Sequence, residues 1–401
     1  MAFGDLKTAI RVTASVALAV AFLSAAPSAA ETGFPDISDR AAIGRVVHAV
    51  CGKRIVILGE ASHSDGHSDS AKVELVEHLV RRCGFNGVLF EASAYEFVPI
   101  SRAHEAGKPI TADNIGSAVG GLWKFDQEVQ PLFGFLADNV NAGKVVIAGL
   151  DFQAGGVGQP YSNEGMIAEL ALRLPTNRRD FCRAAYAAHV LGADSPAGVT
   201  AEDLPSALRA CFAEMRTSLS GDDNDARVEL DNLSAWVTLS EQGFGPMVIG
   251  RDEMMFKNAS RILESLGARG KVVIWTHNAH AARNSTMLKD YQGAPTLGSL
   301  LGRRYENQAF ALAITARGGS FRWSGSENRP VPTAAPGMLE AFTDSPKPAA
   351  TTFIDHDALQ RLGNIPAGFI FHAAITANWS TAYDGVLLLN VEHPPHSTRP
   401  N

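Results

Sequence analysis

Six short apolar runs recur along the chain, with longer amphipathic stretches between them. The runs cover 54–58, 87–90, 144–148, 271–275, 309–315 and 385–390. Continuous apolar runs of this length are typical of strands that helices cover on both faces, as in a parallel sheet. Their alternation with helical patterns predicts an α/β fold, with a mostly parallel sheet and flanking helices.

The segment between the first two runs predicts a helix that begins near Asp69 or Ser70 and ends at Gly84. Its apolar positions have helical spacing: Val73, Val76, Leu79 and Val80. Two strands joined by such a helix form a βαβ unit, which is right-handed by default.

A different pattern covers 161–266, where amphipathic stretches follow one another without a convincing strand. We interpret this part as a helical insertion that packs beside the sheet and covers a ligand pocket. Segment 318–348 is rich in Gly, Ser and Pro and predicts a loop. Residues 394–401 predict a frayed, flexible tail.

The N-terminus has the pattern of a secretory signal peptide. Lys7 and Arg11 precede an apolar run over 12–26, and small residues at 27–30 resemble a cleavage site. We therefore expect residues 1–30 to be removed and 31–401 to form the folded domain, in the periplasm or outside the cell. The alternative is an uncleaved anchor, for which the apolar run is short. No other segment is apolar enough to predict a stable membrane anchor.

Composition and charge indicate which kind of partner the protein can bind. The chain of 401 residues is 46% hydrophobic and carries a formal net charge of −7. A protein surface that binds nucleic acid needs clustered Lys and Arg to neutralise the phosphates. We therefore do not expect nucleic acid as a partner. Nothing in the sequence indicates the oligomeric state.

Four cysteines remain after the expected cleavage, which permits two disulfides in three connectivities. Cys51 and Cys83 each precede an apolar run by a few residues, so parallel neighbouring strands place both thiols at one sheet end. This favours a Cys51–Cys83 bridge and a second bridge, Cys182–Cys211, between helical segments. The alternative is four reduced, partly buried thiols.

Ionisable residues follow four of the predicted strands directly. Glu60 and His63 follow the first, Glu91 the second, and Asp151 the third, while the fourth leads into the pair His277 and His280. Ligands of open parallel sheets bind beyond the carboxyl ends of the strands, because loops and helix N-termini converge there. We therefore expect these side chains to line one cleft.

The same residues carry a resemblance to the erythromycin esterase family. The blocks that carry it, in order, are Leu58 to His63, Phe90-Glu91, Trp123 with Glu128, Gly149 to Gln153, Arg251-Asp252 to Asn258, and Trp275 to His280. The resemblance implies a hydrolase that opens a macrolide lactone with water, without a required metal or other cofactor, using a histidine base supported by carboxylates. The family also has many members of unassigned substrate.

Carried over by position, the resemblance makes His63 the general base, Glu60 and Glu91 its paired carboxylates, and His277 and His280 the later histidines. Lys72 stands where the family usually has an arginine, and it keeps the charge without the planar fork. Ser62 and Ser64 replace the usual Thr and Gly beside the base. These departures suggest a related pocket for a different substrate.

Elementary chemistry supports the same assignment. Ester hydrolysis needs a base that titrates near neutral pH, and histidine is the side chain closest to this value. A carboxylate on His63 would fix its tautomer, while Lys72, His277 or His280 could donate to a developing oxyanion. Asp151 and Trp123 are candidates for substrate binding. The structural alternatives are Glu91 as a buried partner of Lys72, and His277 as a satisfied histidine beneath the helical insertion.

The sequence lacks the motifs of other catalytic classes. It has no G-x-S-x-G elbow of serine hydrolases, no H-E-x-x-H zinc helix and no Walker-type loop. A second class of function stays open: a metal- or haem-binding protein, or a metal-dependent hydrolase. Its ligands would come from this set: His63, Asp65, His67, Asp69, His277 and His280. The first interpretation is an exported, metal-independent, esterase-like hydrolase that acts on a small-molecule ester or lactone.

Overall fold

The computed structural model describes residues 37–156, 158–221, 223–323, 327–342 and 351–398. The expected signal peptide at 1–30 lies outside these residues. Their main element is a seven-stranded sheet in the order β3-β2-β4-β1-β5-β11-β8. Its strands are β1 (Ile55–Leu58), β2 (Gly87–Ser93), β3 (Val146–Asp151), β4 (Val272–Trp275), β5 (Ala309–Ala316), β8 (Thr352–Asp355) and β11 (Gly385–Leu389).

All neighbouring pairs in this sheet are parallel except β8, which runs antiparallel to β11. The mostly parallel α/β fold is therefore confirmed, and each of the six predicted apolar runs forms one of its strands. The edge strand β8 was not among the predicted runs, because its four residues begin with Thr352, end with Asp355 and do not form a continuous apolar run.

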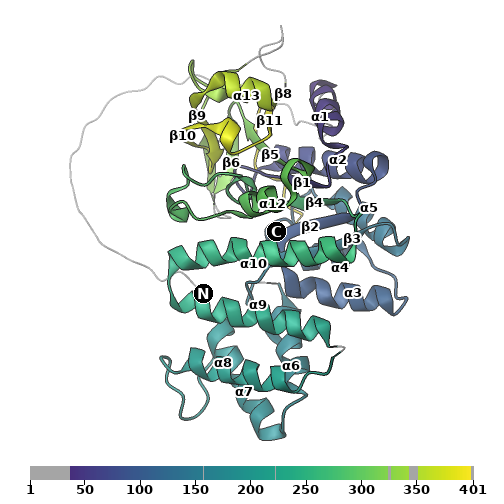
Figure 1. The fold of residues 1–401 in the computed structure, drawn as a ribbon, viewed down its shortest axis with the longest axis vertical. Helices are drawn as coiled ribbons and strands as arrows, with labels where there is room; N and C mark the ends of the chain where they lie inside the picture. The colour runs from purple at the N-terminus through teal and green to yellow at the C-terminus, as the bar shows by residue number, and fades with distance from the viewer. Residues whose placement is uncertain (1–36, 157, 222, 324–326, 343–350, 399–401) are drawn as a thin grey trace, which may run out of the picture.

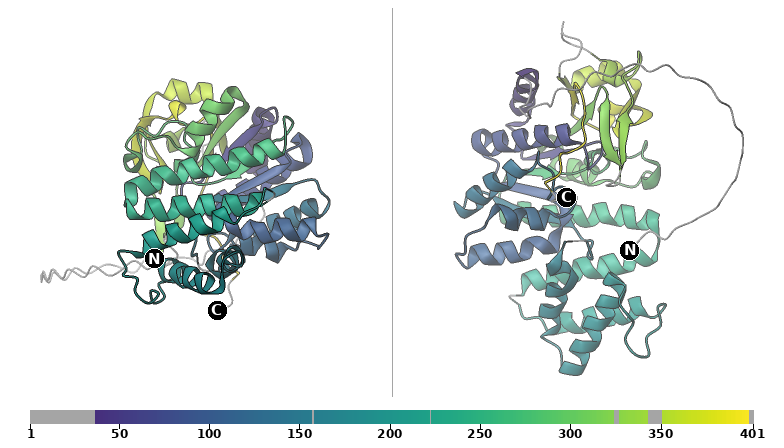
Figure 2. Two further views of the ribbon diagram at one scale, coloured as in Figure 1. Left: turned by 60° about the horizontal axis from the view of Figure 1, so that its bottom comes forward. Right: turned by 180° about the vertical axis from the view of Figure 1, so that it is seen from behind.

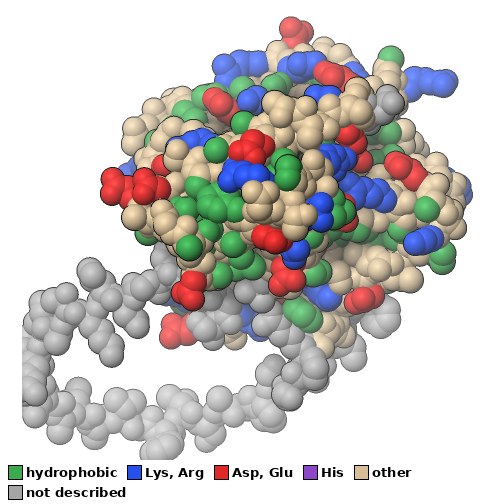
Figure 3. Space-filling model, turned by 90° about the horizontal axis from the view of Figure 1, so that it is seen from below, with side chains coloured by type: hydrophobic (Ala, Val, Ile, Leu, Met, Phe, Trp, Pro, Cys, Tyr) green, Lys and Arg blue, Asp and Glu red, His purple; other side chains and the backbone are tan. Residues whose placement is uncertain are grey.

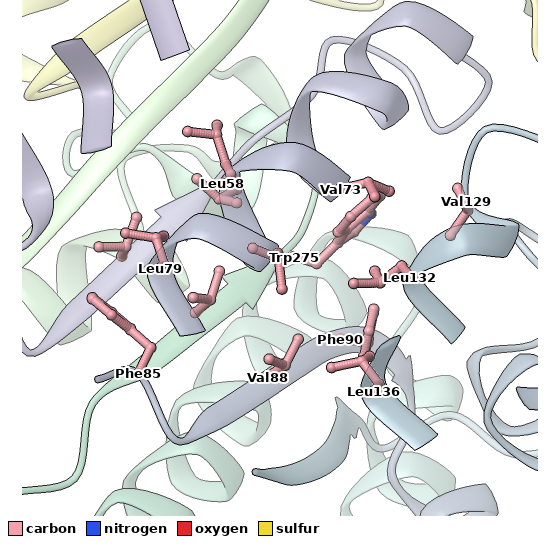
Figure 4. Packing of buried hydrophobic residues seen from close by; sticks show 14 of the residues in the cluster. Leu58, Val73, Leu79, Phe85, Val88, Phe90, Val129, Leu132, Leu136 and Trp275 are labelled. Carbon is pink, nitrogen blue, oxygen red and sulfur yellow. The ribbon is translucent and has the colours of Figure 1, made fainter. Parts of the chain in front are cut away.

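Successive residues of each strand point alternately to the two faces of the sheet, and each face packs into its own hydrophobic core. Leu58, Phe90 and Trp275 face α1 (Ile37–Val50), α2 (Gly66–Cys83), α4 (Ala112–Val119) and α5 (Gln130–Asn141). Figure 4 shows these strand residues packed against Val73 and Leu79 of α2 and Leu132 and Leu136 of α5. This two-sided burial explains why the strands are continuously apolar.

The opposite core joins the sheet to α10 (Phe244–Ser265), α11 (Asn278–Ala281), α12 (Leu297–Tyr305) and α13 (His356–Leu362). A hairpin of β9 (Asn364–Ile370) and β10 (Ala373–Asn378) also packs on this side. In Figure 1, α10 lies across the molecule, and α9 (Asn224–Glu241) lies next to it on the side away from the sheet.

The part at 161–266 contains helices only, among the residues that the structure describes. They are η2 (Tyr161–Gly165), α6 (Met166–Ala171), α7 (Thr176–Leu191), α8 (Leu204–Thr217), α9 and α10. The helices η2 and α6–α9 have a core of their own, which Tyr95 joins from η1 (Ala94–Phe97) after β2. Figures 1 and 2 show these helices stacked away from the sheet beyond α10. On the face in Figure 3, basic and acidic side chains are interspersed.

Both predicted disulfides are present. Cys51–Cys83 joins the ends of α1 and α2, and Cys182–Cys211 joins α7 to α8. The alternative of four reduced thiols is therefore wrong for this structure. Helix α3 (Val98–Glu105) follows η1 directly in the chain. No helix among the described residues is both long and apolar enough to cross a bilayer.

Two expectations for loops need correction. Within 318–348, β6 (Gly319–Trp323) and β7 (Glu327–Val331) pair as an antiparallel hairpin. A two-stranded hairpin tolerates Pro330 because both strands are edges. The expected frayed tail is also docked as far as residue 398: Gln127 N–H donates to His396 O, and Thr398 N–H donates to Phe125 O. These backbone hydrogen bonds join segments far apart in sequence, so local composition does not reveal them.

Candidate functional site

The charged residues that follow the strands meet at one end of the sheet. Strands β3, β2, β4 and β1 are consecutive neighbours. Asp151 ends β3, Glu91 lies in β2, and Glu60 follows β1 by two residues. The convergence expected from the sequence is therefore present, because the four parallel strands end side by side.

His63 is held between two buried carboxylates. Its Nδ1 lies 2.7 Å from Glu60 Oε1, and its Nε2 lies 3.5 Å from Glu91 Oε1. Both glutamates are buried, whereas the imidazole keeps 25% of its side-chain surface exposed. A ring that donates from Nδ1 to Glu60 presents Nε2 toward Glu91 and the open side.

This environment changes the acidity of the imidazole. Burial alone lowers the pKa of His63, but the negative charge of Glu91 and the hydrogen bond to Glu60 outweigh it and raise the pKa to about 9. The His63 ring is therefore a stronger base than an ordinary histidine, and it is mostly protonated at neutral pH.

Lys72 pairs with Glu60, not with Glu91. Its Nζ donates to Glu60 Oε2 over 2.5 Å and lies 4.1 Å from the ring centre of Trp275. The side chain is fully buried, so it has no surface for a substrate. Lys72 therefore fixes Glu60, which in turn fixes His63, and the expected role of Lys72 as an oxyanion donor does not fit its position.

Glu91 is the centre of the site. Its Oε2 accepts from Thr276 Oγ1 at 2.6 Å and from His277 N–H at 2.8 Å. Its Oε1 accepts from Arg251 Nη2 at 2.8 Å and lies 3.2 Å from His280 Nε2. Burial raises the pKa of Glu91, but the charges of His280 and Arg251 dominate and hold it well below its usual range. Glu91 is therefore a fixed anion.

Arg251 reaches the sheet edge from α10 and was absent from the predicted site residues. Asp151 Oδ2 accepts from its Nε at 2.9 Å and from its Nη2 at 2.7 Å. Asp151 therefore anchors Arg251, and only 9% of its own side chain is exposed. The Arg251 side chain is 20% exposed, which leaves part of the guanidinium open.

A second buried network orients His280. Its Nδ1 donates to Asp252, with Nδ1–O distances of 2.9 and 3.0 Å. Asp252 Oδ2 also accepts from Tyr291 Oη, at 2.6 Å, in η3 (Lys289–Tyr291). Burial lowers the pKa of His280, but Asp252 and Glu91 raise it to about 10. His280 is therefore a cation that faces Glu91.

Sequence reasoning missed Arg251, Asp252 and Tyr291 as site residues. The adjacent Arg251-Asp252 pair in an amphipathic stretch was the available signal, and it belonged to one of the blocks of the resemblance. Tyr291 had no comparable signal, because it reaches the site only through the packing of η3 beside α10.

His277 turns away from the opening. Its Nε2 donates to Ala61 O at 2.7 Å, and its Nδ1 accepts from Ala279 N–H at 3.0 Å. Burial lowers the pKa of His277 to about 3, and the positive charge of His63 adds to this effect. The ring is neutral with both nitrogens in use, which agrees with the structural alternative of a satisfied histidine.

Gly59 lets α11 approach the end of β1. A Cβ atom at Gly59 would lie 2.1 Å from Asn278 Oδ1 and 3.0 Å from Asn278 Cα. Asn278 is fully buried, and its Nδ2 donates to Ile314 O and Phe369 O, both at 2.9 Å. The amide therefore has no room to give way.

We expect Gly59→Ala to lower the free energy of unfolding by about 1–3 kcal/mol, because it overpacks this contact. Urea unfolding with intact disulfides measures the effect. Gly44→Ala in α1 is the matched control, since its Cβ meets nothing within 4 Å and alanine favours a helix. Equal stability of the two variants would contradict the packing argument.

Trp123 supports His63 instead of contacting a substrate. Its ring meets the His63 ring edge-on, with centroids 5.2 Å apart, and its exposed surface is 0%. The expected substrate-binding role therefore becomes a packing role. The edge-on contact restrains the orientation of the imidazole.

Of the metal ligands considered from the sequence, His63, His277 and His280 lie at this site, whereas His67 and Asp65 have partners elsewhere. His67 Nε2 lies 2.8 Å from Asp39 Oδ2, and its Nδ1 lies 2.6 Å from Val391 O. Asp65 accepts from Ser62 N–H and faces His372. Burial raises the pKa of Asp69 well above its usual value, which weakens this carboxyl group as a metal ligand, because a ligand must be deprotonated.

Comparison with known proteins agrees with this geometry. The family model described as erythromycin esterase matches residues 80–390. The chain belongs to the erythromycin esterase family. Membership makes it a hydrolase of the esterase type. A curated relative, "Putative hydrolase YbfO" of Bacillus subtilis (strain 168), is 22% identical over 323 residues, which cover 73% of this chain and 72% of the relative.

Solved structures share the erythromycin esterase fold. A histidine-to-asparagine variant of erythromycin esterase EreC, in its open conformation, superposes with a TM-score of 0.65 at 15% identity, covering 89% of this chain and 95% of that chain. A succinoglycan biosynthesis protein has a TM-score of 0.67 at 16% identity, with coverage of 88% and 92%. At these identities, the likeness shows the fold alone.

Proposed function

We propose that this member of the erythromycin esterase family is an exported hydrolase that cleaves a small-molecule carboxylic ester or lactone with water activated by His63. One observation carries the proposal: a partly exposed imidazole lies between the buried carboxylates of Glu60 and Glu91. An open, strengthened base with a fixed tautomer is what water activation requires.

The reaction needs one base and one site for negative charge. His63 Nε2 takes a proton from water while the water oxygen bonds to the carbonyl carbon, forming a tetrahedral oxyanion. When the oxyanion collapses, the bond between the acyl carbon and the alkoxy oxygen breaks. The proton on His63 passes to that oxygen, leaving an acid and an alcohol, or one hydroxy acid from a lactone. No covalent enzyme intermediate is required.

Arg251 is the best-placed donor for the oxyanion. Its Nη1 lies 3.0 Å from His280 Nε2. Because His280 carries both ring protons near neutral pH, that nitrogen cannot accept a hydrogen bond. The Nη1 hydrogens therefore remain available for a developing negative charge, on a side chain that Asp151 and Glu91 hold in place.

The proposal of export rests on the N-terminal pattern at 1–30 and on the two disulfides. Disulfides persist in oxidising compartments such as the periplasm or the extracellular space. The helical insertion contributes Arg251 through α10, so we assign to it the shaping of the substrate pocket.

We expect Lys72→Met to abolish most of the activity, because it leaves Glu60 buried without its cation. Breaking a buried pair on one side costs about 3–5 kcal/mol. Lys72→Arg should keep activity within a few-fold, since it restores the charge. Thermal unfolding and kcat/KM of both variants test this expectation. A Lys72→Met enzyme with normal kcat/KM would exclude a positioning role for Lys72.

The raised pKa of His63 predicts an alkaline rise in activity. The base is active only when neutral, so kcat/KM should increase about tenfold per pH unit from pH 7 and level off near pH 9. Glu60→Gln removes a negative charge and leaves Lys72 in place, and both effects lower the pKa of His63. The rise should therefore move to lower pH in this variant.

Glu77→Gln on the same helix as Lys72 is the control, because Glu77 pairs with Arg81 away from the site. Its pH profile should match that of the unmodified enzyme. A rise centred near 6.5 in the unmodified enzyme would mean that the carboxylates do not act on His63 as described.

The substrate class is best tested by a hydrolysis screen. Purified enzyme is incubated with macrolides and with simple acyl esters, and the new carboxylic acid is detected by mass spectrometry. In H₂¹⁸O, one ¹⁸O atom should enter the acid product. The proposal fails if no ester or lactone is cleaved, or if His63→Asn cleaves them at an unchanged rate.

A further inference from the structure

A cluster of metal-ligating side chains lies outside the proposed hydrolytic site. Glu128, His393 and His396 each offer a ligand atom, and these atoms all lie within 4.8 Å of one another. It is the only such group found among the residues that the structure describes. His396 Nδ1 is 2.5 Å and His393 Nδ1 is 3.9 Å from the same oxygen, Glu128 Oε1.

The two histidines are held in place by the backbone around them. They flank Pro394 and Pro395, whose rings fix φ and limit the freedom of the spacer. His393 O accepts from Gly66 N–H at 2.7 Å, and His396 O accepts from Gln127 N–H at 2.8 Å. The backbone of both ligands is therefore held in place, and binding requires His393 Nδ1 to exchange its hydrogen bond to Pro394 O, at 3.0 Å, for the ion.

The packing of His393 leaves no room for a side chain at Gly66. A Cβ atom there would lie 2.9 Å from His393 Nδ1. The His393 ring also stacks on His67, with centroids 5.9 Å apart and planes inclined by 11°. These contacts restrain the plane of the His393 ring.

The donor set selects the kind of ion. Two imidazole nitrogens and one carboxylate oxygen suit Zn²⁺, which binds such sets tetrahedrally with water in the fourth position. The Glu128 side chain is only 8% exposed, whereas that of His396 is 67% exposed. The carboxylate therefore forms a buried base for the site, and the fourth position faces solvent.

We propose that Glu128, His393 and His396 bind Zn²⁺ and thereby fasten the terminal segment, residues 391–398, to the loop at 123–128. That loop begins at Trp123, whose ring orients His63. The terminal segment also contacts Gly66 and His67, which follow His63 by three and four residues. The ion would stabilise the two walls beside His63, and it takes no part in the hydrolytic step.

Calorimetric titration of the chelator-treated full chain, without a polyhistidine tag, tests the site with ZnCl₂ and with MgCl₂. We expect one Zn²⁺ per chain and no Mg²⁺ binding. His396→Asn and Glu128→Gln should each weaken Zn²⁺ binding by about a hundredfold, since each removes one of three protein ligands. Zn²⁺ should also raise the unfolding temperature of the unmodified protein but not that of His396→Asn.

Two control variants make the result specific. His104→Asn changes another exposed histidine and should leave Zn²⁺ affinity unchanged. His63→Asn should leave it unchanged as well, because His63 belongs to the other cluster. The proposal is overturned if the unmodified protein shows no saturable Zn²⁺ binding. It is equally overturned if His396→Asn binds Zn²⁺ as tightly as His104→Asn, or if His63→Asn is the variant that loses the ion.

Discussion

Replacement of His63 by asparagine is expected to lower kcat/KM about a thousandfold, in the middle of the range for general acid–base catalysis. Asparagine keeps a polar group next to Glu60 but cannot take a proton from water. The loss should appear mainly in kcat, because the proposed role of His63 concerns the reacting proton and not substrate binding.

Steady-state kinetics on the ester identified by the screen measure this effect. The His63→Asn variant should also lose the alkaline rise in kcat/KM, since the titrating group is gone. His104→Asn provides the matched control at an exposed position far along the chain in α3. A large drop in kcat that leaves the pH profile intact would assign the proton transfer to a different residue.

Most of the fold prediction rested on the continuous apolar runs that form the strands. Parallel strands covered on both faces must be apolar throughout, so runs such as 54–58 and 271–275 stand out in the sequence. The positions of Glu60, Glu91 and Asp151 followed from the same pattern, because parallel strands present their carboxyl ends at one edge. The Cys51–Cys83 bridge followed from it as well.

The roles within the site were harder to predict, because they depend on side-chain direction. His277 and His280 are three residues apart, yet one donates to Ala61 O and the other faces Glu91. Lys72 pairs with Glu60 and not with Glu91, because α2 buries its amine beside Trp275. Spacing along the chain contains no information about these choices.

Long-range packing explains the remaining differences. Arg251 lies in the helical region, 100 residues beyond its partner Asp151. The segment at 394–398 looked like a tail because its contacts with 125–128 join residues about 270 positions apart, which local composition does not report. The β6–β7 hairpin was missed because backbone pairing gives it order despite its glycines and proline.

Arg251→Met is expected to lower kcat about a hundredfold to a thousandfold, as loss of one oxyanion donor does in other hydrolases. Arg251→Lys should also lose most of this contribution, because an ammonium group cannot hold Asp151 and Glu91 in a fork while donating to a substrate. Arg261→Lys is the control on the same helix, where the guanidinium contacts Asn258 and kcat should stay within a few-fold.

The pH profile separates a role in the reaction from a merely structural one. Loss of the Arg251 charge near Glu91 leaves more negative potential at His63, which raises its pKa. The alkaline rise in kcat/KM should therefore move above pH 9 in Arg251→Met and stay in place in Arg251→Lys. If Arg251→Met raises KM while kcat and the pH profile are unchanged, Arg251 anchors the substrate and the oxyanion has another donor.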